Sequence, residues 1–421
     1  MTPHVMTPHV ITWIVTAVAI LGVIARPFHW PEAIWAVTGA VILVVGGLLS
    51  PADAWTGVLK GLDVYLFLIG MMALSEVART EGLFDWLAGH AVRQAKGSAS
   101  RLFLLIYIVG TIVTTFLSND ATAVVLTPAV YAAAKAAKAE PLPYLFICAL
   151  IANAASFILP ISNPANLVVY ASHMPPLGQW LVRFGLASIL SVVVTFLILR
   201  WTQRKSLREP IETDFATRPL SLSGKIARLG IVMTGAVLIA ASALDRDLGL
   251  PTFAAGLLTV AVVLILKREN PWAIAKDMSW GVLPLVAGLF VLVEALEKSG
   301  VLRMLGQVLT SAAARSDGFA GWTSGVIVAV ASNMVNNLPA GLLAGAAVQT
   351  AQVHDKVAGA ILIGVDLGPN LSVTGSLATI LWLNAIRREG ESVGAWTFLK
   401  LGLIVMPPAL VAALAGLLVL P

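Results

Sequence analysis

Long apolar runs alternate with short polar segments along the whole chain, and their lengths predict its organisation. A helix needs about 17 to 25 apolar residues to cross a bilayer. Windows of that kind predict ten crossings, of which two, 143–172 and 358–386, are interrupted by Pro, Gly and Asn residues. The other crossings lie near residues 10–25, 32–50, 62–79, 178–200, 226–244, 252–267, 279–297 and 396–419. The pattern predicts an all-α polytopic membrane protein.

Two further apolar regions, 102–135 and 318–350, do not fit a simple crossing. In each, arms of about 14 to 16 residues meet at a polar tip, Ser118-Asn119-Asp120 in the first and residues 332–337 (SNMVNN) in the second. Since a helix rises about 1.5 Å per residue, such arms fall short of the roughly 30 Å hydrocarbon core. We therefore predict that each region is a re-entrant helical hairpin.

An internal repeat relates the two halves of the chain. The segment GMMALSEVARTEGLFDWL from Gly70 aligns with GLFVLVEALEKSGVLRML from Gly288 at an offset of 218 residues. Two weaker matches follow in the same order: Ser118-Asn119 with Ser332-Asn333 at an offset of 214, and Asn153 with Asp366 at 213. Each copy contains five crossings and one hairpin. Because five is odd, the second copy enters the membrane from the opposite side, which predicts inverted repeats like those of secondary transporters.

The repeat and the basic residues together predict the domain boundaries. Residues 1–200 form the first inverted repeat, with hairpin 102–135 and broken helix 143–172. Residues 226–421 form the second, with hairpin 318–350 and broken helix 358–386. The segment 201–225 between them is rich in Lys and Arg, and short basic loops face the cytoplasm. We predict that this segment is a cytoplasmic linker and that both termini lie outside.

Composition supports the membrane assignment and excludes several other classes. Hydrophobic residues make up 58% of the 421 residues and charged residues only 12%, about half the share in a soluble domain. The net charge of +5 does not indicate nucleic-acid binding, because the Lys and Arg residues form no basic stripe. The single cysteine, Cys148, excludes an intramolecular disulfide and a multi-thiolate metal site. Neither a GxxxxGK[ST] sequence nor a His-rich metal motif is present, so the sequence predicts no cofactor and no enzymatic activity.

Four polar breaks carry the candidate chemistry. Non-helical backbone at membrane depth is tolerated only where it is buried in protein or lines a wet cavity. The breaks are the two hairpin tips and the segments 160–167 (PISNPANL) and 367–376 (LGPNLSVTGS), where Pro and Gly interrupt a helix. Half-helix ends around a midplane cavity bind polar solutes or ions, so we expect the four breaks to form one small site. The candidate substrate-binding residues are Ser118, Asn119, Asn153, Ser162, Asn163, Asn166, Ser332, Asn333, Asn336, Asn337, Asn370, Ser372, Thr374 and Ser376.

Structural roles are the alternative for these polar residues, which also cap helix ends and join helices in membrane bundles. That alternative does not account for Asp120 and Asp366, because a cap does not require a charge at membrane depth. Ionisable groups inside the membrane are functional candidates by default. We therefore predict that Asp120 and Asp366 couple transport to protons. Glu76 and Glu294 lie near the ends of crossings, where a salt bridge or the interface is the expected environment.

Several motifs carry a resemblance to a known family. LSNDATAVVLTP, NAASFILPISNPANLVV, SNMVNNLPA and especially GVDLGPNLSVTGSLATILWL resemble signatures of the ArsB arsenite and antimonite efflux permeases, over essentially the whole chain. That family is part of the ion transporter superfamily, which also contains sodium/proton antiporters and sodium-coupled dicarboxylate carriers. The resemblance implies proton-coupled export of trivalent arsenic or antimony across the bacterial cytoplasmic (inner) membrane. It also implies scaffold and transport subdomains, with a separate ArsA-type ATPase subunit as a candidate partner.

Departures from the family and the alternatives to it leave the coupling open. Some members have an acidic residue where this chain has Asn153 and a lysine where it has Asn370. Trivalent arsenic in neutral water is mainly an uncharged tris-hydroxide, which suits Asn, Ser and Thr side chains. Sodium/proton antiport or sodium-coupled anion transport on the same scaffold is the alternative. A multi-pass membrane enzyme is another, for which the sequence offers no nucleophile with its base.

Overall fold

Helices account for nearly all the regular structure of the chain. The computed structural model describes residues 8–170, 174–212, 219–244, 246–351 and 353–419, and in these ranges there is no strand beyond an isolated bridge between Ser98 and Pro210. Six described helices are long and apolar enough to cross a membrane, and a seventh span results if α3 and α4, bent by 46°, are counted as one. The predicted all-α polytopic fold is confirmed.

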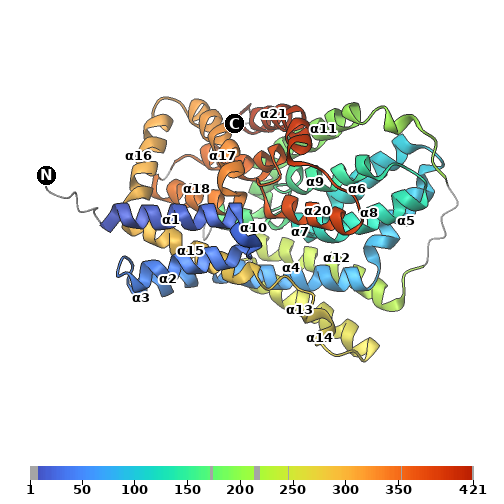
Figure 1. The fold of residues 1–421 in the computed structure, drawn as a ribbon, viewed down its shortest axis with the longest axis horizontal. Helices are drawn as coiled ribbons and strands as arrows, with labels where there is room; N and C mark the ends of the chain where they lie inside the picture. The colour runs from blue at the N-terminus through green and yellow to red at the C-terminus, as the bar shows by residue number, and fades with distance from the viewer. Residues whose placement is uncertain (1–7, 171–173, 213–218, 245, 352, 420–421) are drawn as a thin grey trace.

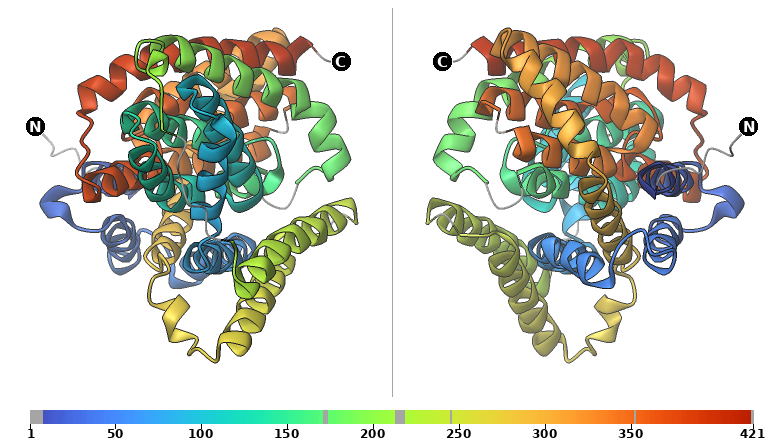
Figure 2. Two further views of the ribbon diagram at one scale, coloured as in Figure 1. Left: turned by 90° about the vertical axis from the view of Figure 1, so that its right-hand side faces the viewer. Right: turned by 90° about the vertical axis from the view of Figure 1, so that its left-hand side faces the viewer.

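Two bodies of helices lie side by side (Figures 1 and 2). The first body contains both N-terminal parts of the predicted repeats: α1 (Pro8–Ala25), α2 (Glu32–Val45), α3 (Pro51–Lys60), α4 (Leu62–Thr80), α12 (Leu222–Ala243), α13 (Gly249–Lys267), α14 (Trp272–Ala275) and α15 (Val282–Lys298). The second body contains α5 (Leu83–Ala95), α6 (Ala99–Leu117), α7 (Asn119–Ala121), α8 (Thr127–Ala136), α9 (Pro141–Ala154), α10 (Pro164–Tyr170) and α11 (Leu177–Thr202). It also contains α16 (Val301–Ala313), α17 (Asp317–Val335), α18 (Asn337–Ala351), α19 (Asp355–Leu367), α20 (Leu377–Arg388) and α21 (Ala395–Val419).

The helix boundaries repeat with the offset of 218 residues found in the sequence. Both ends of α5 and α6 match both ends of α16 and α17 when 218 is added to the residue number. Packing partners are exchanged between the copies, because α4 packs against α13 while α15 packs against α2. Gly70 and Gly288 lie at these two crossings, where an added Cβ would come within 2.5 Å and 2.7 Å of the facing backbone. The equivalent helices α5 and α16 lie at opposite ends of the long axis (Figure 1), as inverted repeats require.

The hairpin arms are longer than the sequence suggested. Helices α6 and α17 each have 19 residues, and about 1.5 Å per residue gives a length close to the roughly 30 Å hydrocarbon core. Helix α6 is longer because Ser98 caps it, accepting from the backbone N–H of Arg101 at 3.3 Å, so the helix starts at Ala99 and not near residue 102. Helix α17 starts close to the predicted position, after the cap Ser316, but continues to Val335, beyond the predicted tip at Ser332. The length argument for re-entrance is therefore wrong for the first arm of each hairpin, and re-entrance itself stays a prediction.

Other boundaries shift by a few residues. Helix α11 ends at Thr202 and α12 begins at Leu222, so the segment between the halves is 203–221, of which 213–218 lie outside the described residues. The predicted start of the second half at residue 226 is late because Ser221 caps α12, accepting from the N–H of Gly224 at 2.9 Å. Helices α5 and α16 were not expected, since their mixed polar and apolar faces do not form an apolar run.

Both predicted broken helices are interrupted. The first consists of α9, the 3-10 turn η3 (Pro160–Ser162) and α10, and its last residues, 171 and 172, are outside the described part of the chain. The second consists of α19, η6 (Gly368–Leu371) and α20. The buried indole of Trp180 on α11 donates to the carbonyl of Phe157 at 3.1 Å, just beyond the end of α9. This hydrogen bond anchors the first break to the core of the second body.

Candidate functional site

The first hairpin reverses at Ser118, between α6 and α7. Its φ of 91° is rare for a residue with a side chain, and such backbone strain gathers at functional sites. The hydroxyls of Thr114 and Thr122 lie 2.8 Å apart and join the two arms beside the tip. A π-helical turn, η2 (Thr122–Leu126), follows the tip and precedes Pro128, which has no N–H to donate to the carbonyl of Val124. The hydroxyl of Thr127 donates to the carbonyl of Thr122 at 3.2 Å.

The second hairpin reverses at Asn336, whose φ is 69°. Residues 118 and 336 differ by 218, the same offset as Gly70 and Gly288. The structural equivalent of Ser118 is therefore Asn336, and the sequence alignment of Ser118-Asn119 with Ser332-Asn333 is one helical turn out of register. Ser332 instead lies inside α17, is buried and donates to the carbonyl of Val328 at 2.9 Å.

Polar groups at the second tip bind the second break. Asn333 accepts from the hydroxyl of Ser372 at 2.7 Å through its Oδ1, and its backbone carbonyl accepts from Thr374 at 3.1 Å. Asn336 donates to the carbonyl of Thr374 at 3.4 Å, and the N–H of Asn337 donates to the carbonyl of Gly375 at 2.9 Å. The structure therefore brings these candidate residues together, but their groups bond to one another.

Three further candidates satisfy backbone groups that the breaks set free. Asn166 donates to the carbonyls of Ser156 at 2.8 Å and Pro160 at 3.2 Å. Ser162 donates to the carbonyl of Thr115 at 3.1 Å. Ser376 caps α20, its Oγ accepting from the N–H of Thr379 at 3.1 Å. These contacts match the structural alternative considered for the polar breaks.

Two side-chain pairs connect the broken helices of different repeats. Asn163 Nδ2 donates to Asp366 Oδ1 at 2.7 Å, and Asp366 is fully buried. Within the described ranges, the other oxygen, Oδ2, has no hydrogen-bond partner. Asn153 Nδ2 donates to Asn370 Oδ1 at 3.0 Å, and Asn370 Nδ2 donates to the carbonyl of Leu150 at 2.9 Å. Asn153 and Asn370, at which the resemblance to the ArsB permeases leads us to expect departures, are thus in direct contact.

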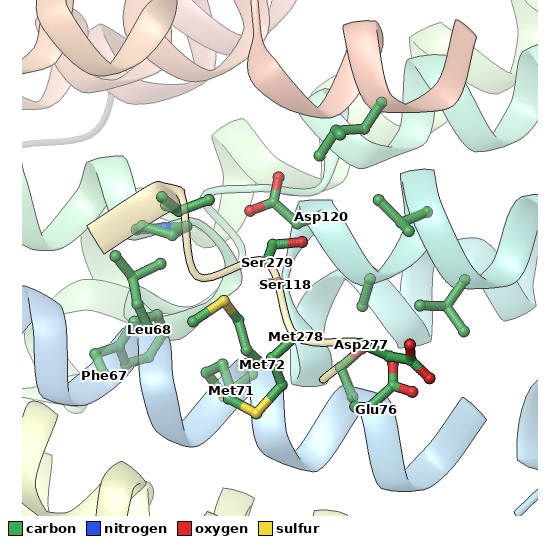
Figure 3. A pocket seen from close by; sticks show the side chains of 17 residues that line it. Phe67, Leu68, Met71, Met72, Glu76, Ser118, Asp120, Asp277, Met278 and Ser279 are labelled. Atoms are coloured by element: carbon green, nitrogen blue, oxygen red, sulfur yellow. The ribbon is translucent and has the colours of Figure 1, made fainter. Parts of the chain in front are cut away.

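A cavity of about 80 Å³ lies between the two bodies, next to the first tip. Ser118 and Asp120 line it from the tip, Pro164 from the first break, and helix α4 and residues 277–279 from the first body (Figure 3). Its volume holds several water-sized groups, since one water needs roughly 10–15 Å³ of such space. Among the residues that the structure describes, no hydrogen bond or ion pair engages the Asp120 carboxylate. The other thirteen substrate candidates do not line this cavity, and the expectation that all four breaks form one site stays a prediction.

The residues that sequence reasoning missed come from the first body. Met71, Met72 and Ser75 of α4, with Met278 and Ser279, line the cavity together with the tip. An apolar window gives no sign of which face of a crossing helix meets a cavity. The repeat could have drawn attention to α4, because its strongest match begins at Gly70.

Ion pairs hold the two glutamates of the repeat. Glu76, also at the cavity, accepts two hydrogen bonds from Arg79 Nε at 3.0 and 3.1 Å. Glu294 accepts from Lys60 Nζ at 2.6 Å and is 4% exposed. The salt bridges expected for these residues are confirmed. Over the described ranges, no cluster of three or more His, Cys, Asp or Glu side chains could hold a metal ion.

Comparison with known proteins assigns the family. The model of the CitMHS family, described as a citrate transporter, matches residues 11–367. The chain belongs to this family. It is 26% identical over 410 residues to an arsenical pump membrane protein of Escherichia coli, covering 91% of this chain and 92% of that protein. It is 24% identical over 418 residues to a putative arsenical pump membrane protein of Bacillus subtilis, covering 93% and 95%.

Solved structures share the fold at low sequence identity. The Alcanivorax borkumensis YdaH transporter superposes with a TM-score of 0.57 at 15% identity, covering 87% of this chain and 86% of that chain. Neisseria gonorrhoeae MtrF superposes with a TM-score of 0.58 at 12% identity, covering 99% and 95%. Together with the family, these likenesses make this CitMHS member a multi-pass membrane transporter similar to arsenical pump membrane proteins.

Proposed function

We propose that this CitMHS member is a secondary active transporter that exports trivalent arsenic and antimony hydroxides from the cytoplasm in exchange for protons. The observation that carries the proposal is the charge of the cavity at the first hairpin tip. Its lining includes three carboxylates, Glu76, Asp120 and Asp277, and no Lys, Arg or His among the described residues. Such a lining disfavours an anionic solute and is compatible with an uncharged one.

A carboxylate substrate fits this lining poorly. The family description names citrate, and a multiply charged anion is bound by Arg and Lys side chains. The nearby guanidinium of Arg79 is already engaged by Glu76 and lies 3.4 Å from Asp277. A neutral tris-hydroxide instead needs donors and acceptors, which Ser118 and Asp120 supply from the tip.

Asp120 and Asp366 are the groups that we propose to carry the coupling proton. Neither has a cationic partner in the described part of the chain. In the proposed cycle a cavity open to the cytoplasm takes up the hydroxide while one carboxyl group releases its proton inward. Reorientation of the second body against the first then releases the hydroxide outside and admits an external proton, as in alternating access. Use of a separate ArsA-type ATPase belongs to the same proposal.

The test is metalloid accumulation in everted membrane vesicles energised by respiration, with and without a protonophore. Wild type is compared with Asp120→Asn and Asp366→Asn, and with Asp317→Asn as a control on an exposed carboxylate. The amide oxygen introduced by Asp366→Asn can still accept from Asn163, so the change removes the titratable group and keeps the contact. We expect protonophore-sensitive arsenite and antimonite uptake in wild type and the control, and its loss in at least one of the other variants.

Other outcomes favour other functions. If folded wild-type protein accumulates neither metalloid, the export proposal is wrong. Sodium-dependent proton flux in the same vesicles would then support sodium/proton antiport, the alternative on this scaffold. Uptake that persists with a protonophore but requires ATP and a second subunit would place the energy source in an ATPase.

A further inference from the structure

The face of the cavity opposite the first tip is rich in thioethers. Met71, Met72 and Met278 are three of the 17 residues that line it, whereas the chain has only 10 methionines in 421 residues. Composition alone would place fewer than one there. Figure 3 shows the three side chains gathered around the end of the cavity that faces α4, across from Asp120. The cavity therefore has an oxygen-rich side and a sulfur-rich side.

The two sides match the two parts of a trivalent arsenic or antimony hydroxide. Its hydroxyl groups would exchange hydrogen bonds with oxygens on the tip side, those of Ser118 and Asp120. The central atom is soft, and thioether sulfur is a soft, polarisable ligand.

We propose that Met71, Met72 and Met278 form a soft face that selects trivalent arsenic and antimony hydroxides over neutral hydroxides of hard elements, such as boric acid. The contact is non-covalent and exchanges no proton, because a thioether carries none. It is weaker than a thiolate bond, which allows release on the other side of the membrane. This inference rests on the export function proposed above and adds its selectivity.

Leucine substitutions separate the role of sulfur from that of packing. Leu keeps the volume and apolar character of Met and removes the sulfur. Met71→Leu, Met72→Leu, Met278→Leu and the triple variant are compared with Met406→Leu, a buried methionine of α21 outside the cavity. Initial rates of arsenite and antimonite uptake are measured in everted vesicles, with boric acid as a competitor. Met72 is only partly buried, so Met72→Leu disturbs the packing least. This single variant tests the proposal if the triple variant does not fold.

The expected result is a loss of metalloid uptake on the order of two- to tenfold in the cavity variants, the effect of contacts of ordinary strength. The loss should be larger for antimonite, the softer centre, and boric acid should compete better than in wild type. If wild type is active and the folded cavity variants keep its rates and selectivity, the proposal of a soft face is wrong and the export function stands. Inactive wild type would overturn the export function and this inference with it.

Discussion

The contact between Asn153 and Asn370 gives the sharpest test of how the two broken helices are joined. Asn153 Nδ2 lies 3.0 Å from Asn370 Oδ1 and 3.3 Å from Thr379 Oγ1, and both asparagines are fully buried. Leu has nearly the same shape as Asn and no polar atoms. Asn153→Leu therefore removes one donor and leaves the acceptor Asn370 Oδ1 buried without it.

Leaving one buried polar group unsatisfied costs about 1–3 kcal/mol. Replacing both partners of a hydrogen bond costs less than the two single replacements added together. Asn370→Leu removes the same hydrogen bond and also the one to the carbonyl of Leu150. We expect each single variant to lose about 1–3 kcal/mol of unfolding free energy. The double variant should be more stable than the sum of the two losses predicts, by about 1–2 kcal/mol, since the shared contact is lost once.

The chain supplies its own unfolding probe. Cys148 is the single cysteine and is fully buried on α9, so a thiol-reactive dye labels it only when the second body opens. Thermal midpoints in detergent are read from the dye signal for wild type, both single variants and the double variant. Gln307→Leu, an amide-to-leucine change on an exposed position of α16, is the control. Additive losses, or midpoints equal to wild type, would show that the pair does not join the helices.

Three further changes probe the first body and the tip. Lys60→Met should destabilise the protein by about 1–3 kcal/mol, because it removes the 2.6 Å partner of the buried Glu294, and the same dye measures it. Gly70→Ala should cost about 1–3 kcal/mol or more, since its Cβ would meet the backbone of α13, while Gly178→Ala, with open space around it, should leave the midpoint unchanged. Thr122→Val removes the hydroxyl pair beside the first tip. It should lower metalloid uptake in vesicles by a larger factor than the accompanying fall in thermal midpoint accounts for.

Much of the fold could be predicted because its signals are local or repeated. The apolar runs located the crossings within a few residues, and Pro160 and Pro369 marked the breaks in the broken helices. The amphipathic helices α5 and α16 were missed because helices with one polar face do not form apolar windows. The first arm of each hairpin is longer than predicted, because Ser98 is a cap and not a loop residue in the first hairpin and because the second hairpin reverses at Asn336 and not at Ser332.

The site was less accessible from the sequence, because contacts across the fold decide it. The motif SN marked Ser332 as an equivalent of Ser118, although the chain reverses one turn later at Asn336. The pairing of Asn163 with Asp366 joins residues 203 positions apart, and no pattern in either segment predicts it. The methionines of the cavity are ordinary apolar residues in a crossing helix, so only the arrangement of the two bodies gives them a candidate role.

The offset of 218 residues also separates the roles of the two tips. It pairs Asn119 with Asn337 and Asp120 with Leu338, so the second tip has no carboxylate equivalent to that of the first. The second tip bonds to its own break through Asn333, whereas the Asp120 carboxylate faces the cavity with no partner in the described residues. The two tips therefore differ: the second is hydrogen-bonded to its own break, and the first lines a cavity. This difference supports the proposal that the first tip contacts the substrate, because the second tip has no carboxylate equivalent to that of Asp120.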